Sequence, residues 1–176
     1  ETLRELKKNG VIEKAGVSVY NPEQAEETLK DEVYDAVQLP MNIFDTRFIR
    51  SGVLKKLYNS GKIVFVRSVF LQGLFFADPS GLNGILEPAR LPLKQLASLA
   101  EKEGMSIAQL AVSYVRDIEE VTSLVIGAEI PSQVRDNIKL IEGPCISEKT
   151  RHEAYRLFDG MPLQILEPWR WERDEF

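Results

Sequence analysis

The sequence predicts an α/β fold with about four parallel strands covered by helices, and two observations lead to this prediction. Short apolar segments recur at residues 12–18, 34–39, 63–68 and 123–127, and each is followed by a turn and a segment of helical period. Strands that are apolar on both faces and alternate with helices are typical of a parallel sheet. Each segment also carries polar residues at its C-terminal end, where α/β barrels and doubly wound sheets build their sites. We therefore expect a ligand site at that edge of the sheet.

The first half of the chain contains clear start and stop signals for helices. Residues 2–9 form a predicted helix that ends at Gly10, because glycine suits the left-handed position after a helix. After the first strand, Asn21 is a predicted N-cap, and Gln24 can reach back to it. Another helix is predicted over residues 52–59, directly before the third strand.

The second half begins with a long connection and continues with helices. Residues 74–91 are rich in Pro, Gly and Asp, and a connection of this length is typical of a functional lid or a disordered segment. A capping pattern at Ser106 and Gln109 begins one of the later helices. Helices are predicted over residues 92–103, 106–116, 131–141 and 147–158.

Composition and charge exclude several classes of function. The 176 residues are 44% hydrophobic and 28% charged, and no apolar stretch approaches the roughly 20 residues of a membrane helix. The net charge of −5, without a basic cluster, gives no footprint for nucleic acid. We therefore expect one cytoplasmic domain that binds neither nucleic acid nor a membrane. Because Glu1 stands where a methionine would begin a chain, we also expect a segment that belongs upstream.

The sequence offers no cysteine metal site and no intrachain disulfide. Cys145 is the only cysteine, so it cannot pair within the chain, and we expect a small apolar residue beside a turn. His152 is the only histidine and lies in a predicted helix of mixed character. We expect it to be a surface or packing residue, because a general acid or base must lie within reach of the reacting atom.

Four motifs in a fixed order resemble those of the aldo-keto reductases. They are Lys-Ala-Gly-Val-Ser at 14–18, Asp-Ala-Val-Gln-Leu-Pro-Met-Asn at 35–42, Val-Arg-Ser-Val-Phe-Leu-Gln-Gly at 66–73, and Val-Ile-Gly-Ala at 125–128 with Gln133 and Asn137. The resemblance implies the C-terminal half of a (β/α)8 TIM barrel of about 250 residues or more. We accordingly expect a single partial domain, with barrel units over 1–141 and a C-terminal helix and tail over 142–176.

The resemblance also implies the reaction, which is NAD(P)H-dependent reduction of a small-molecule carbonyl compound by hydride transfer. In this family the catalytic tyrosine, lysine, aspartate and histidine lie in the first half of the barrel, and none of their motifs occurs here. We therefore expect no catalytic residue in this chain and no carbonyl reductase activity from the chain alone. The expected cofactor is NADP or NAD.

Three residues match positions around the nicotinamide. Ser18 and Gln38 match the side chains that bind the carboxamide, although Val19 replaces the asparagine that usually follows the serine. Alternatively, Ser18 bonds the backbone and Gln38 is a packing amide. Arg67 replaces an aromatic ring that stacks on the nicotinamide, and a planar guanidinium can stack as well. Its alternative is an ion pair with a buried carboxylate of the missing half.

Further matches lie along the phosphates. Ser68, Phe70 and Gln72 match the loop beside the pyrophosphate, where Phe70 would contribute only its backbone. Gly127 begins the turn into the helix whose first turn would face the adenosine phosphates.

The predicted adenosine end completes this set. Asp136 and Asn137 match residues that hold the adenine. Gln133 replaces the arginine that many members use to bind a 2′-phosphate, and a glutamine cannot supply that bidentate charge.

Two functions and one origin remain open from the sequence. The chain is the cofactor-binding half of a reductase, a non-catalytic half-barrel that serves as a binding or assembly module, or a trimmed product of the full enzyme. A half-barrel leaves two sheet edges and an apolar concave face uncovered. We therefore expect a partner, either the missing N-terminal half or a second copy of the chain.

Overall fold

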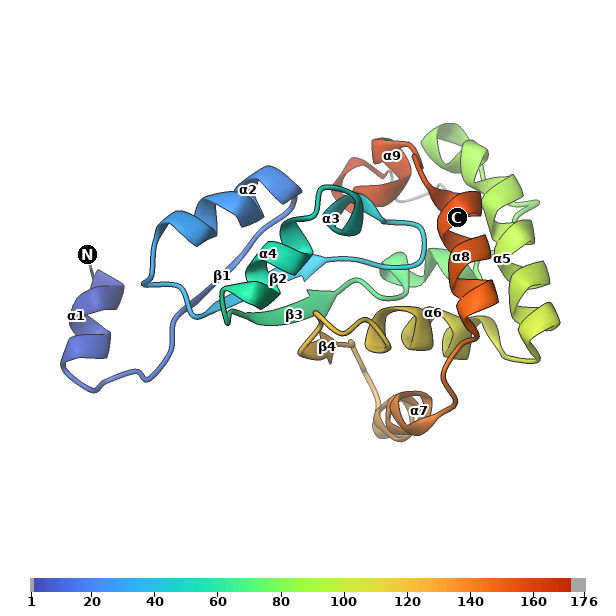
Figure 1. The fold of residues 1–176 in the computed structure, drawn as a ribbon. Coiled ribbons are helices and arrows are strands. Elements are labelled where there is room, and N and C mark those ends of the chain that lie inside the picture. The colour runs from blue at the N-terminus through green and yellow to red at the C-terminus, as the bar shows by residue number, and fades with distance from the viewer. Residues whose placement is uncertain (1, 172–176) are drawn as a thin grey trace.

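The computed structural model describes residues 2–171 and contains one parallel four-stranded sheet (Figure 1). Neighbours in sequence are neighbours in the sheet, in the order β1-β2-β3-β4. The strands are β1 Gly16–Ser18, β2 Ala36–Pro40, β3 Ile63–Arg67 and β4 Ser123–Val125. The predicted α/β class with about four parallel strands is therefore confirmed.

The first strand is shorter than the sequence predicts. Residues 12–15 are not part of the sheet, because the chain there closes the preceding helix α1 (Thr2–Lys8). The backbone N–H groups of Val11 and Ile12 donate to the carbonyl of Leu6, at 2.9 and 3.4 Å. Strand β4 also ends early, at Val125, so that residues 126 and 127 lie in the connection to the next helix.

The two faces of the sheet have different surroundings. On one face, alternate residues of the two central strands are fully buried beneath the helices, and these are Val37, Leu39, Val64 and Val66. The opposite face is exposed or half-buried, and one row across it consists of the register partners Ser18, Gln38, Phe65 and Ser123. The expectation of strands apolar on both faces is therefore wrong, because this row includes three polar residues.

Helices follow the strands, with caps that local sequence predicts. They include α2 Pro22–Glu27, α4 Val53–Asn59, α5 Arg90–Glu103, α6 Ile107–Arg116, α7 Pro131–Glu142 and α8 Glu148–Phe158. The Asn21 side chain accepts a bond from the backbone of Gln24 at 2.8 Å, as predicted. The Gln24 side chain accepts from the backbone of Tyr20, one residue before the cap. Two short helices, α3 Arg47–Arg50 and α9 Leu163–Leu166, were not predicted.

The long connection after β3 is not a disordered segment. It contains two 3-10 helices, η2 Leu71–Phe76 and η3 Gly84–Ala89, and η3 packs against α5 and α9. Leu82 and Leu86 are fully buried there. The disordered alternative is therefore wrong, because these leucines anchor the segment in the core, and the functional lid stays a prediction.

The C-terminal region shares the core of the sheet. Phe158 and Leu166 belong to the same buried cluster as the sheet residues. A last 3-10 helix, η4, covers Pro168–Arg170. His152 is exposed on α8, as expected, whereas Cys145 is exposed and not the buried apolar residue that we expected. Within residues 2–171 no helix is long and apolar enough to cross a membrane.

Candidate functional site

A cavity of about 680 Å³ lies beyond the C-terminal ends of β3 and β4. Its volume falls within the range of about 300 to 1,000 Å³ that small-molecule sites occupy. Seven of the ten residues predicted from the family motifs line it, namely Ser68, Phe70, Gln72, Gly127, Gln133, Asp136 and Asn137. The tertiary structure therefore brings together residues from two segments about sixty positions apart.

The loop after β3 forms one wall of this cavity in an unusual backbone conformation. Three residues other than glycine have positive φ, which are Ser68 at 63°, Leu71 at 47° and Gln72 at 51°. Such conformations are costly and persist only where the surroundings determine them. Here Leu71 is buried, and its N–H donates to the carbonyl of Ser68 at 2.9 Å. The strain is thus held at the cavity wall, which is typical of ligand sites.

Gly127 lies on the opposite wall, where the fold itself does not require a glycine. A Cβ atom at this position would meet no protein atom within 4 Å, and its φ lies outside the left-handed region. At Gly16, by contrast, a Cβ would lie 3.0 Å from the carbonyl oxygen of Ala36. The glycine at 127 therefore leaves room for close approach of a ligand to the backbone.

The first turns of α7 bring polar side chains to the cavity. The side-chain oxygen of Gln133 accepts bonds from the backbone of Glu129 at 2.6 Å and of Ile130 at 3.3 Å. Gln133 thus caps its own helix, a role that the motif comparison did not predict. Asn137 donates to the carbonyl of Gly127 at 3.3 Å, and Asp136 forms an exposed ion pair with Lys139 at 2.9 Å.

The charge of the cavity wall is negative. Glu129 and Asp136 are its two charged lining residues within the described part of the chain, and neither Lys nor Arg lines it there. Sequence reasoning missed Glu129, together with Ala108 of α6 and Leu140 of α7. The position of Glu129, two residues after Gly127, could have indicated it. No sequence signal could have indicated Ala108, because only the packing of α6 brings it to the cavity.

The other three predicted residues lie on the open face of the sheet. Ser18 and Gln38 are register partners on adjacent strands, and the Gln38 amide donates to the Ser18 hydroxyl at 3.0 Å. With Phe65 they line a shallower hollow of about 360 Å³. Gln38 is half-buried, so in this chain it is not the enclosed packing amide that was the alternative.

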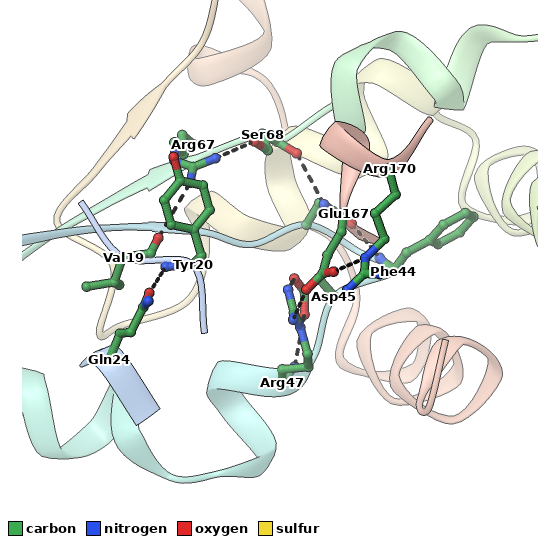
Figure 2. Close-up of polar contacts among 11 residues, drawn as sticks. Val19, Tyr20, Gln24, Phe44, Asp45, Arg47, Arg67, Ser68, Glu167 and Arg170 are labelled. Atoms are coloured by element: carbon green, nitrogen blue, oxygen red, sulfur yellow. Dashed lines mark hydrogen bonds and ion pairs between the residues drawn. The ribbon is translucent and has the colours of Figure 1, made fainter. Parts of the chain in front are cut away.

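Arg67 projects from the end of β3 toward the neighbouring strands, as Figure 2 shows. Its guanidinium lies over the Tyr20 ring, 4.8 Å from the centroid, and donates to the Ser68 hydroxyl at 3.3 Å and the Val19 carbonyl at 3.5 Å. Within residues 2–171 it has no carboxylate in ion-pair range. The Trp169 ring packs edge-on against Tyr20, with the centroids 5.2 Å apart.

A compact ion-pair cluster, also visible in Figure 2, holds the segment that carries Trp169. Arg47 forms two bonds with the buried carboxylate of Asp45, at 2.8 and 2.7 Å, and lies 3.7 Å from Glu167. Glu167 also pairs with Arg170. These hydrogen bonds, which Arg47 donates to the Asp45 carboxylate, raise the pKa of Arg47. This cluster joins residues about 120 positions apart, so no local pattern could have predicted it.

Two of the five tyrosines, Tyr114 and Tyr58, do not line the large cavity. Tyr114 is fully buried on α6, and burial raises its pKa to about 12. Tyr58 bonds to Glu119, and the charge of that carboxylate raises the Tyr58 pKa. Both residues lack the pocket position that a general acid needs.

Comparisons with known proteins decide the family. The model of the Aldo/keto reductase family matches residues 1–151. The chain belongs to this family. The resemblance of the four motifs to those of the aldo-keto reductases is therefore confirmed.

The similar proteins are about twice as long as this chain. The L-glyceraldehyde 3-phosphate reductase of Escherichia coli O157:H7 is 26% identical over 154 residues, which cover 72% of this chain and 43% of the relative. That of strain K12 is 25% identical, with 76% and 46% covered. The chain thus spans less than half the length of the curated relatives that it matches.

Solved structures of aldo-keto reductases have the same fold. The holo form of AKR11C1 from Bacillus halodurans aligns with a TM-score of 0.72 at 23% identity, covering 88% of this chain and 53% of that one. The glycerol dehydrogenase AKR11B4 from Gluconobacter oxydans aligns with a TM-score of 0.68 at 24% identity, covering 97% and 55%. The four parallel strands and their helices therefore correspond to about half of an aldo-keto reductase barrel.

Proposed function

We propose that this chain is the nicotinamide-cofactor-binding half of an NAD(P)H-dependent carbonyl reductase. Carbonyl reduction with NAD(P)H is the general activity of the aldo-keto reductase family. The observation that carries the proposal is the cavity of about 680 Å³ lined by seven residues that match cofactor positions of the family. The cofactor, when bound, would supply the hydride that reduces a small carbonyl compound.

In this proposal the chain's residues bind and orient the cofactor. The loop of Ser68, Phe70 and Gln72 follows the pyrophosphate, where backbone N–H groups and hydroxyls are suitable donors. Ser18 and Gln38 together offer the donor and acceptor that a carboxamide needs, after exchange of the 3.0 Å bond that now joins them. Proton donation belongs to residues outside this chain's motifs.

The charge of the cavity favours NAD over NADP. The Glu129 carboxylate on its wall would repel a 2′-phosphate and can accept a bond from a ribose 2′-hydroxyl, whereas the charge of Asp136 is paired with Lys139. The acceptor oxygen of Gln133, at the position of the phosphate-binding arginine, is engaged in capping α7. We therefore infer a preference for NAD(H).

The open face also requires a cover in the assembled protein. Strands β1 and β4 are sheet edges, and the half-buried Phe65 and Ile63 lie on the face opposite the helices. Unpaired strand edges beside apolar side chains promote association. We propose that the other half of a barrel or a second copy of this chain covers this face.

Cofactor titration tests the function. We expect the protein to quench or enhance the fluorescence of NADH on binding and to bind NADPH more weakly. Gln133→Arg should shift the ratio of the two affinities toward NADPH by about tenfold or more, because a charge-assisted hydrogen bond contributes roughly 1.5 to 3 kcal/mol.

A matched control uses the same helix. Val134→Arg adds the same charge at an exposed position outside the cavity lining, and we expect it to leave the affinity ratio unchanged. Thermal melting of both variants shows whether loss of the Gln133 cap has unfolded α7. If neither dinucleotide binds to the folded protein, the cofactor-binding function is wrong and the non-catalytic binding module remains.

A further inference from the structure

Arg67 differs from Arg47 and Arg116, two other half-buried arginines, in how its charge is balanced. Arg47 has the carboxylate of Asp45 at 2.7 Å, and Arg116 has that of Asp117 at 2.7 Å. Arg67 has only uncharged partners in the described chain, namely a hydroxyl, a carbonyl and an aromatic ring. No carboxylate among residues 2–171 therefore neutralises its positive charge, and that charge acts on whatever occupies the neighbouring site.

Arg67 lies between the two parts of the candidate site. Its register partners are Pro40 on one side and Val125 on the other, and Val125 lines the large cavity. Gln38 is two residues before Pro40 and therefore points to the same face of the sheet as Arg67. A ligand that extends from the cavity to the Ser18–Gln38 pair must consequently pass beside the guanidinium.

The guanidinium is also held in place. Tyr20 lies against one face of it, and the Tyr20 backbone is fixed by the Gln24 side chain at 2.8 Å. Trp169 packs behind the Tyr20 ring, on the segment held by the Glu167 cluster. Because these contacts oppose its withdrawal, the charge is a fixed feature of the site.

We propose that Arg67 makes this site discriminate between the two redox states of the nicotinamide, so that the reduced cofactor binds more tightly than the oxidised one. This inference rests on the proposed function. The reduced nicotinamide ring is neutral and the oxidised ring carries a positive charge, while the rest of the two molecules is the same. A fixed guanidinium beside the ring therefore repels only the oxidised form.

The repulsion weakens the binding of NAD⁺ and not that of NADH, so it changes the ratio of the two dissociation constants. At about 4 Å, two unit charges repel by about 1 kcal/mol even in water, and this corresponds to about a fivefold change in affinity. A protein with such an arginine binds the reduced cofactor and releases the oxidised cofactor more readily. It therefore favours reduction of carbonyl compounds over oxidation of alcohols.

The experiment compares dissociation constants for NADH and NAD⁺, measured by fluorescence and calorimetry on the wild type and on Arg67 variants. We expect NADH to bind more tightly to the wild type, and Arg67→Gln to reduce the ratio of the two constants by about fivefold or more. Arg67→Lys keeps the charge and should keep most of the ratio. Arg67→Tyr restores a stacking ring without charge and should lower the ratio as Arg67→Gln does.

The outcomes separate this inference from the function on which it rests. If NADH and NAD⁺ both bind and their ratio is the same in the wild type and in Arg67→Gln, the redox discrimination is wrong and the cofactor site stands. If the folded wild type binds neither form, the proposed function itself fails. Loss of the ratio in Arg67→Lys as well would show that geometry, and not charge, separates the two forms, which also contradicts the inference.

Discussion

The two faces of the sheet differ in how far their side chains are buried. The face under the helices is closed, since Leu39 and Val66 are fully buried in a continuous core. The opposite face carries Ser18, Gln38 and Arg67, which contact one another or their neighbours but remain accessible. Adjacent residues of one strand point to opposite faces of the sheet. Residues that stabilise the core therefore alternate along the strand with residues that can contact a ligand.

The arginines repeat this contrast. On the closed side, Arg116 bonds to Asp117 and to the carbonyls of residues 141, 143 and 144, so it closes the turn after α7. Arg47 is likewise enclosed by Asp45 and Glu167. Arg67 on the open face has no such carboxylate in the described chain. The charges of Arg47 and Arg116 are therefore compensated within the fold, and we assign the charge of Arg67 to a ligand.

The largest effect should come from adjacent residues of β2. Leu39→Ala removes a fully buried side chain and should lower the free energy of unfolding by about 2 to 5 kcal/mol. Gln38→Ala, one position earlier on the open face, should lower the free energy of unfolding by less than about 1 kcal/mol. The hydrogen bond that its side-chain amide donates to Ser18 is accessible to solvent. Denaturant unfolding measures both. Equal losses would mean that the open face is as much a part of the core as the closed one.

The second effect separates the two kinds of arginine. Asp45→Asn leaves the enclosed guanidinium of Arg47 with only the more distant Glu167, and we expect a loss of about 3 kcal/mol. Arg67→Gln should change the free energy of unfolding by less than about 1 kcal/mol, because the charge is uncompensated in the described chain. A large loss in Arg67→Gln would show that its contacts with Tyr20 are a structural requirement.

The smallest effect is the contribution of Glu103, at the end of α5, to the pH dependence of stability. Bonds from Thr150 and from the backbone of Ser147 lower the pKa of Glu103 below its ordinary value of 4.5. Since the lowered pKa belongs to the folded state, this stabilisation is present above pH 4.5 and is lost as the pH falls through the folded value. Glu103→Gln should therefore be less stable than the wild type near neutral pH, by up to about 1 kcal/mol, with the difference vanishing in acid.

Its control is on the same helix. Glu101 is exposed on α5, and Glu101→Gln removes the same charge from a position away from the start of α8. Thermal melting at several pH values compares the two variants. A constant difference between Glu103→Gln and the wild type at all pH values would contradict the assignment of the effect to this carboxyl.

Local rules determined much of this protein from its sequence alone. The caps at Asn21 and Ser106 form as expected, because a cap depends on residues only three positions apart. The order of strands and helices and the family followed from motifs within single segments. Seven residues of the large cavity were also found in this way, since each motif is local even where the cavity is not.

Only the tertiary structure decided how distant segments complete one another. It placed Tyr20 against Arg67, joined Asp45 and Arg47 to Glu167, and buried Leu82 in a segment whose composition indicated a loop. It also shortened the first strand, because the backbone N–H groups of Val11 and Ile12 donate to the preceding helix. These outcomes depend on packing between residues tens of positions apart, and the periodicity of a single segment carries no information about such partners.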